Sequence, residues 1–302
     1  MREPEFNQPK DHSYKKINRS ESQQVASHLA HTDPQHEPKS GIALEKWEQR
    51  KEILERARSQ SIESIRTAIQ DGILPRSISD RIDILSSIPL NFDLDTPMYN
   101  GEFRPEEWEI DVSISSSEKY YAATVHLLVH EFIHVLSGTS NIVLDEDIME
   151  NRRTGLVARN DYKNKYSYWW LNEAITEILA RKVSGEYYTQ LIGGEDGAHY
   201  QDEIDLLQLL LSKSNQPLDY VLLDAYFEDR STDTPIPLAN EYDVNPQQPA
   251  MQAMGKIFNR VFGKGFLNRL DSHLKSYKGV VEMKQVLSSK DFSPDDIRMK
   301  TK

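Results

Sequence analysis

The sequence contains no cysteine, which excludes both a disulfide framework and a metal site built from thiolate ligands. It also contains no uncharged apolar run of about 20 residues, the length that a membrane-spanning helix requires. No apolar segment follows Met1, so we expect no conventional signal peptide. The lack of a signal peptide and of a membrane-spanning run predicts a cytoplasmic protein without a membrane partner, and a leaderless secreted effector is the alternative.

Basic residues are too few to balance the acidic ones. The 302 residues include 36 Lys and Arg against 48 Asp and Glu, and the formal net charge is −12. Nucleic-acid binding requires basic surfaces that displace counterions from phosphate. The charge balance therefore argues against a nucleic-acid partner. No feature of the sequence specifies an oligomeric state.

Residues 1–40 combine scattered prolines with polar and charged side chains and have few apolar ones. Such a segment cannot bury enough surface to offset the entropy of ordering it. We therefore predict a disordered tail over 1–40 and one folded domain over 41–302. Its parts are expected to be an N-terminal subdomain over about 41–138 and a helical C-terminal subdomain over about 139–302.

The spacing of apolar residues predicts an α+β fold. Helices with a regular apolar stripe are expected over 43–70, 203–211 and 251–275. Between 73 and 115, alternating segments and Asn100-Gly101, a pair typical of hairpin turns, indicate a small sheet. The alternation over 108–114 predicts a strand that leads directly into the next helix.

A His-Glu-x-x-His motif, Val129-His130-Glu131-Phe132-Ile133-His134, lies within an apolar run. Histidines four residues apart share one helix face, so both can bind a single Zn²⁺ at about 2.0–2.1 Å. Glu131 would lie beside the open coordination position, where it can take a proton from a metal-activated water. Burying these three polar groups is costly unless they bind something, so we predict a zinc site.

The helix that carries this motif has recognisable ends. Ser115 and Glu118 have the spacing of a capping box at its start, and Gly138 is expected at its end. His126 lies one turn before His130. Because a helix rises 1.5 Å per residue, His126 and His134 are about 12 Å apart and cannot share one ion. We expect His126 to be a core residue or to contact a metal ligand without binding the metal itself.

A second helix is predicted from Trp169, with Gly185 as its stop signal. Glu173 and Glu177 are four residues apart and point the same way. Glu173 would complete a site of two histidines and one glutamate for one Zn²⁺ per chain. Glu177 could accept the other ring N–H of a ligand histidine. The alternative is an ordinary amphipathic helix with two solvated glutamates.

The two motifs together resemble those of the gluzincin metalloproteases, the thermolysin-like clan, whose second helix carries an Asn-Glu-x-x-x-(Asp/Glu) signature, here Asn172 to Glu177. The resemblance covers roughly residues 105–185. It implies a zincin-like fold: a small sheet and backing helix before the active-site helix, a mainly helical C-terminal half, and a cleft between them. The resemblance assigns His130, His134 and Glu173 as zinc ligands and Glu131 as general base. It assigns Glu177 as the carboxylate that accepts a hydrogen bond from a ligand histidine.

The family pattern also carries two further implications. The strand before the active-site helix is expected at a sheet edge, where an extended substrate pairs with it; an ordinary internal strand is equally compatible with the sequence. The 38 residues between His134 and Glu173 form a longer insertion than in thermolysin. A Gly-x-Met-Glu-Asn segment is absent, which argues against an aminopeptidase and favours an endopeptidase.

A proton donor or oxyanion stabiliser is expected opposite the general base. The candidates are His199 and Tyr200, at the start of a later helix, and Tyr187 or Tyr188. The predicted function is a zinc-dependent peptide hydrolase that acts on a peptide or protein substrate through a metal-activated water, with Glu131 as general base. One alternative is a non-catalytic protein-binding domain on the same fold. Another is a metal hydrolase that acts on a non-peptide amide.

Overall fold

The computed structural model describes residues 42–92, 100–104, 109–113, 117–142, 149–160, 165–192, 200–215, 220–227, 249–274, 277–289 and 292–293. The N-terminal half contains α2 (Ile42–Gln70), η1 (Arg76–Ser86), β1 (Leu90–Phe92), β2 (Asn100–Arg104), β3 (Glu109–Ser113), η2 (Glu118–Tyr120) and α3 (Tyr121–Ser137). An insertion follows with β4 (Thr139–Ile142), β5 (Met149–Thr154), β6 (Val157–Asn160) and β7 (Lys165–Ser167). The remaining helices are α4 (Trp169–Ser184), α5 (Glu186–Ile192), α6 (Gln201–Lys213), α7 (Tyr220–Phe227), α8 (Pro249–Phe262), α9 (Phe266–His273) and α10 (Tyr277–Ser288).

Helices dominate and the sheets are small, so the α+β class predicted from the sequence is confirmed at this level. The predicted tail over 1–40 and the candidate His199 lie outside the described residues. In the part of the chain that the structure describes, no helix has the length and apolar character to cross a membrane.

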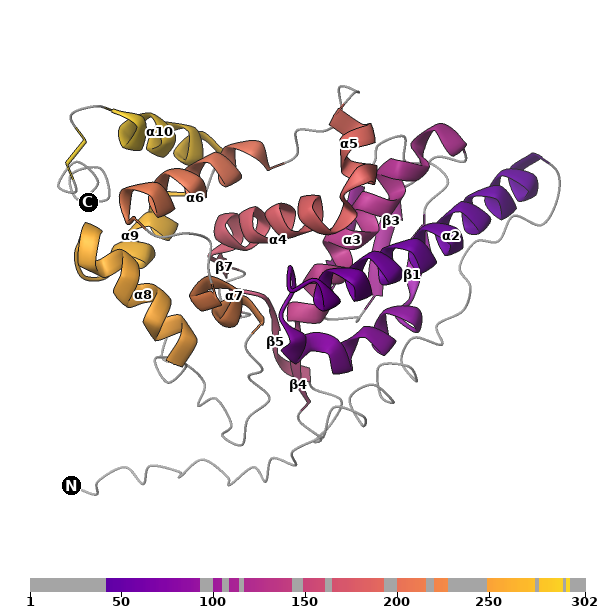
Figure 1. The fold of residues 1–302 in the computed structure, drawn as a ribbon, viewed down its shortest axis with the longest axis horizontal. Coiled ribbons are helices and arrows are strands. Elements are labelled where there is room, and N and C mark those ends of the chain that lie inside the picture. The colour runs from indigo at the N-terminus through magenta and orange to yellow at the C-terminus, as the bar shows by residue number, and fades with distance from the viewer. Residues whose placement is uncertain are drawn as a thin grey trace, which may run out of the picture.

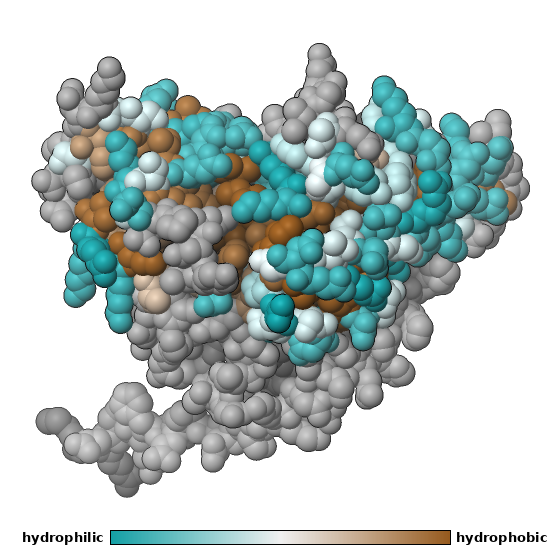
Figure 2. Space-filling view, in the orientation of Figure 1, coloured by the Kyte–Doolittle hydropathy of each residue, from teal (hydrophilic) through white to brown (hydrophobic). Residues whose placement is uncertain are grey.

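The helix α2 lies against α3, the helix of the His-Glu-x-x-His motif (Figure 1). The hydroxyl of Ser61 donates to the carbonyl of Val125 across this contact at 3.1 Å. Figure 2 shows hydrophilic residues over the outer face of α2, where Glu45 and Glu48 are exposed. The helix therefore buries one stripe against α3 and presents the other to solvent, as its sequence pattern predicts.

The first sheet has the strand order β1-β3-β2. The strand β3 pairs in parallel with β1 and antiparallel with β2, so it is internal, and the expectation of a sheet edge at this strand is wrong. The edge beside the motif helix is β2, which packs on α3. Asn100-Gly101 begins β2 and pairs with Ser113 and Val112, so the hairpin turn predicted there is also wrong. Gly101 lacks the positive φ that the usual Asn-Gly turn needs at this position.

The start of α3 differs from the prediction. Tyr120 occupies the N-cap position without a side-chain hydrogen bond, and Ser115 of the predicted capping box lies outside the described residues. The carboxylate of Glu118 instead pairs with Arg56 of α2 at 2.5 Å. At the other end, Gly138 is the C-cap residue, as predicted.

The single helix expected over 251–275 is two helices, α8 and α9. Gly263 and Gly265 have φ values of 86° and 72°, which end one helix before the next begins. The four-stranded sheet β4-β5-β6-β7 between α3 and α4 was not predicted at all.

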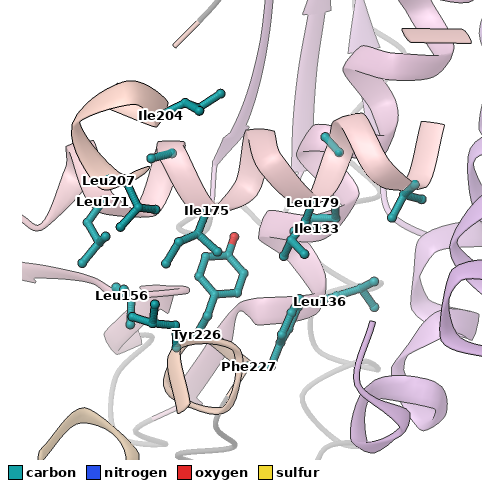
Figure 3. Packing of buried hydrophobic residues seen from close by; sticks show 14 of the residues in the cluster. Ile133, Leu136, Leu156, Leu171, Ile175, Leu179, Ile204, Leu207, Tyr226 and Phe227 are labelled. Atoms are coloured by element: carbon teal, nitrogen blue, oxygen red, sulfur yellow. The ribbon is translucent and has the colours of Figure 1, made fainter. Parts of the chain in front are cut away.

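One hydrophobic core joins the two helices that carry the motifs. Its members in Figure 3 include Ile133 and Leu136 of α3 and Ile175 and Leu179 of α4. Each is at most 1 % exposed, and burying such a side chain contributes about 1.5–3 kcal/mol. Figure 3 also shows Tyr226 of α7 with its hydroxyl directed toward α4. This packing holds α3 and α4 side by side and so determines how the motif residues face one another.

Candidate metal centre

Three buried side chains from two helices converge. His130 and His134 lie one turn apart on α3, and Glu173 comes from the first turns of α4. The Nε2 atom of His130 is 3.1 Å from His134 Nε2 and 3.3 Å from Glu173 Oε2. The distance from His134 Nε2 to the same oxygen is 3.5 Å. All three residues are at most 6 % exposed.

The spacing of these atoms fits a single metal ion. A tetrahedral site with bonds of about 2.0–2.1 Å places its ligand atoms about 3.3–3.4 Å apart. The observed separations of 3.1 to 3.5 Å bracket that value. Among the described residues, His130, His134 and Glu173 form the group of potential metal ligands whose ligand atoms all lie within 4.8 Å of one another. The group could therefore hold a metal ion, which would offset the cost of burying it.

His130 is oriented from behind by Glu177. The Nδ1 atom of His130 lies 3.0 Å from Glu177 Oε2, and a carboxylate can only accept, so the ring N–H is the donor. This bond places a proton on Nδ1 and leaves Nε2 to face Glu173, where it could bind a metal once it has lost its own proton. The structure thus places Glu177 where the sequence predicted it.

His134 is oriented by Thr176. The Thr176 hydroxyl donates to the carbonyl of Asn172 at 2.8 Å, so its oxygen can accept from His134 Nδ1 at 3.4 Å. Asn172 Nδ2 also approaches this nitrogen, at 3.3 Å, and it lies 3.4 Å from Glu173 Oε1. Both histidines therefore direct Nε2 toward the same point.

Tyr226 completes the environment of Thr176. Its hydroxyl lies 2.5 Å from Thr176 Oγ1, and its side chain is fully buried. Burial, together with nearby carboxylates, raises the pKa of Tyr226, so the phenol keeps its proton and can donate. This residue, from α7, contributes to the site although no sequence motif marks it.

The insertion also contacts the site. The backbone N–H of Leu156 donates to Asn172 Oδ1 at 2.9 Å. Gly155, in the turn between β5 and β6, has a φ of 54°, and a Cβ there would overlap Asn172 Oδ1 and approach the Tyr226 ring to 2.5 Å. Only glycine therefore fits this turn, which holds the amide of Asn172 from the side of the insertion.

Glu131 is buried beside the histidines and contacts the edge strand β2. The backbone N–H of Phe103 donates to its Oε2 atom at 2.8 Å. A Cβ at Gly101 would lie 2.9 Å from Glu131 Oε1 and 2.8 Å from Leu127 Cδ1. Burial raises the pKa of Glu131 above its usual range, although the two histidines act in the opposite direction. The strand thus holds the carboxylate through one amide and leaves room for it through one glycine.

Tyr200 covers the site from the start of α6. Its ring stacks on His130, with centroids 5.5 Å apart and an angle of 14° between planes. The pKa of its hydroxyl is raised by burial and by the neighbouring carboxylates of Glu173, Glu131 and Glu177. The φ of 58° at Tyr200 turns the chain sharply into α6. Of the predicted proton donors, the structure places this one beside the cluster.

The charges of the cluster compensate one another. Burial lowers the pKa of His130, but the hydrogen bonds to Glu173 and Glu177 outweigh it and raise the pKa to about 10. Burial likewise raises the pKa of both glutamates, and the histidines outweigh it and hold these pKa values well below their usual range. Without a metal, the two carboxylates are therefore charged, and His130 carries a proton on each ring nitrogen, Nδ1 toward Glu177 and Nε2 toward Glu173.

The structure thus brings together all the residues predicted to bind metal, as well as Glu131, Glu177 and Tyr200. Sequence reasoning missed Thr176 and Tyr226. Thr176 precedes Glu177 on α4 and lies one turn after Asn172, so its place on the helix offered a signal. Comparison of the chain with protein-family models, with curated proteins and with solved structures found no match.

Proposed function

We propose that this chain is a zinc-dependent peptide hydrolase with a zincin-like fold of the gluzincin kind. The observation that carries the proposal is the spacing of His130, His134 and Glu173 on two packed helices, with the buried Glu131 carboxylate beside them. Two imidazoles and one carboxylate are a donor set that zinc hydrolases use. Zinc held there would polarise a scissile carbonyl and activate a water for attack.

Glu131 is the proposed general base. It accepts the proton of the attacking water and passes it to the leaving amine. The N–H of Phe103, 2.8 Å from Oε2, keeps one carboxylate oxygen in place, while Oε1 faces Gly101. A base held in this way needs little reorganisation during the reaction.

Tyr200 is the proposed donor to the developing oxyanion. Its phenol keeps its proton because burial and the neighbouring carboxylates raise its pKa. A protonated phenol within the site can donate a hydrogen bond where negative charge develops.

The substrate is proposed to bind along β2. This strand is at the edge of the first sheet and packs on α3, next to Glu131. An edge strand offers backbone groups with which an extended peptide can pair. The proposed substrate-binding strand is therefore β2, and not β3 as the sequence predicts.

The test combines zinc content with turnover. Purified protein should hold one zinc per chain, and the variants His130→Ala and Glu173→Ala should lose it or bind it weakly. The zinc-loaded wild type should cleave members of a diverse peptide library. Absence of zinc in the wild type would overturn the metal site. Zinc-loaded protein that cleaves no peptide would instead support a binding domain or a hydrolase for another amide.

A further inference from the structure

His126, one turn before His130 on α3, has a polar partner at each ring nitrogen. Its Nδ1 atom lies 2.8 Å from Ser184 Oγ, and its Nε2 atom lies 3.3 Å from Glu177 Oε1. The Ser184 hydroxyl donates to the carbonyl of Ala180 at 2.7 Å. The carboxylate of Glu177 can only accept, so Nε2 of His126 is the donor in that contact.

The two oxygens of Glu177 have different partners. Oε1 accepts from His126 and from Arg181 Nε, at 3.3 and 2.8 Å, whereas Oε2 accepts from His130 Nδ1 at 3.0 Å. Because two donors hold Oε1, the carboxylate cannot rotate without losing them. The oxygen that faces His130 is thus held in place from the opposite side.

The His126 ring is itself fixed by its neighbours. It packs against the Tyr188 ring of α5, with centroids 5.1 Å apart, and the Arg181 guanidinium lies 4.9 Å from the centre of the same Tyr188 ring. The side chain is 14 % exposed. Side chains from α3, α4 and α5 therefore pack against one another around Glu177 and restrict the His126 ring.

We infer that His126 is a positioning residue for the metal centre: by donating to Glu177 it holds the carboxylate that orients His130. The inference rests on the proposed metal site. Groups that orient a metal-binding histidine through its other nitrogen typically change metal affinity by about 10–100-fold when they are altered. His126 acts one bond further away and shares its role with Arg181, so a loss of about 3–10-fold is expected.

The experiment compares two replacements of the same side chain. His126→Phe keeps a ring against Tyr188 but removes the donor to Glu177, whereas His126→Gln keeps an N–H donor. Zinc affinity is measured by competition with a chelator, and the geometry at the metal is followed by the visible absorption of the Co²⁺-loaded protein. We expect His126→Phe to weaken zinc binding about 3–10-fold and to shift the Co²⁺ bands, and His126→Gln to stay within about 2-fold of wild type.

His273→Phe is the matched control, because His273 lies on α9 with Glu282 as its partner at 3.8 Å. It should change neither zinc affinity nor the Co²⁺ bands. Wild-type zinc affinity and unshifted Co²⁺ bands in His126→Phe would overturn the inference and leave the metal site standing. A wild type that binds neither zinc nor Co²⁺ would overturn both.

Discussion

The hydroxyl of Tyr226 lies 2.5 Å from Oγ1 of Thr176. The side chain of Tyr226 lies inside the hydrophobic core (Figure 3). Thr176 donates its own proton to Asn172, so its oxygen is left to accept from Tyr226 and from His134. A tyrosine of α7 is thereby linked to a proposed metal ligand of α3 through a threonine of α4.

Replacing Tyr226 with Phe should therefore weaken the metal site as well as the fold. Loss of a buried hydrogen bond is expected to cost about 1–2 kcal/mol in the free energy of unfolding. The freed Thr176 hydroxyl would also hold His134 less firmly, and zinc affinity should fall a few-fold. Chemical unfolding of the metal-free protein and chelator competition measure the two effects.

Tyr168→Phe provides the control for that variant. Tyr168 is also buried, and its hydroxyl bonds to Asn268 of α9 instead of to a residue of the proposed metal site. The Tyr168→Phe variant should lower the free energy of unfolding by about as much as Tyr226→Phe does, without changing zinc affinity. Equal zinc affinities for Tyr226→Phe and wild type would contradict the proposed link.

The carboxylate of Glu131 should be essential for turnover and dispensable for metal binding. Glu131→Gln keeps the size of the side chain and removes its ability to take a proton. General acid–base catalysis typically contributes about 10²–10⁴-fold, so the rate of peptide cleavage should fall by that factor while zinc content stays at the wild-type level. A variant that cleaves peptides at the wild-type rate would rule out Glu131 as the base.

Gly101→Ala tests whether β2 positions the general base. The added methyl would lie 2.9 Å from Glu131 Oε1, so the carboxylate would have to shift. Small displacements of catalytic groups can reduce rates by about 10²-fold, and we expect a loss of about 10–100-fold in turnover with unchanged zinc affinity.

Gly255→Ala is the control for this substitution, because nothing lies within 4 Å of a Cβ at that helical position. It should leave turnover unchanged and should stabilise the protein by about 0.5–1 kcal/mol. Full activity in Gly101→Ala would show that the strand does not constrain Glu131.

Zinc binding should release protons near neutral pH. In the metal-free protein, burial opposes protonation of His130, but Glu173 and Glu177 outweigh it and raise the pKa to about 10. The proton must leave the metal-binding nitrogen before zinc can bind there. Apparent affinity should therefore rise with pH up to about 10 and fall as the pH is lowered.

Calorimetric titrations at pH 7 in two buffers of different ionisation enthalpy measure this proton release. The observed heat should depend on the buffer. Identical heats in both buffers would show that Nε2 of His130 carries no proton at this pH in the metal-free protein.

The local chemistry of the site was readable from the sequence. Helical spacing places His130 and His134 on one face of α3, and Glu173 and Glu177 on one face of α4. This follows because a helix repeats every 3.6 residues wherever it lies. The apolar stripes of α2 and α4 and the stop at Gly185 follow from the same local periodicity. Such features depend only on neighbours in the chain, so they could be predicted without the fold.

Other parts of the site were decided by contacts between distant segments. Tyr226 reaches Thr176 across 50 positions of sequence, and His126 reaches Glu177 across 51. The order β1-β3-β2 made β2 the edge strand, although alternation in β3 was the clearer signal. Asn100-Gly101 became part of a strand because pairing with β3 and packing on α3 outweighed its local turn preference. Local periodicity identified the residues that could act, and long-range packing decided which of them meet.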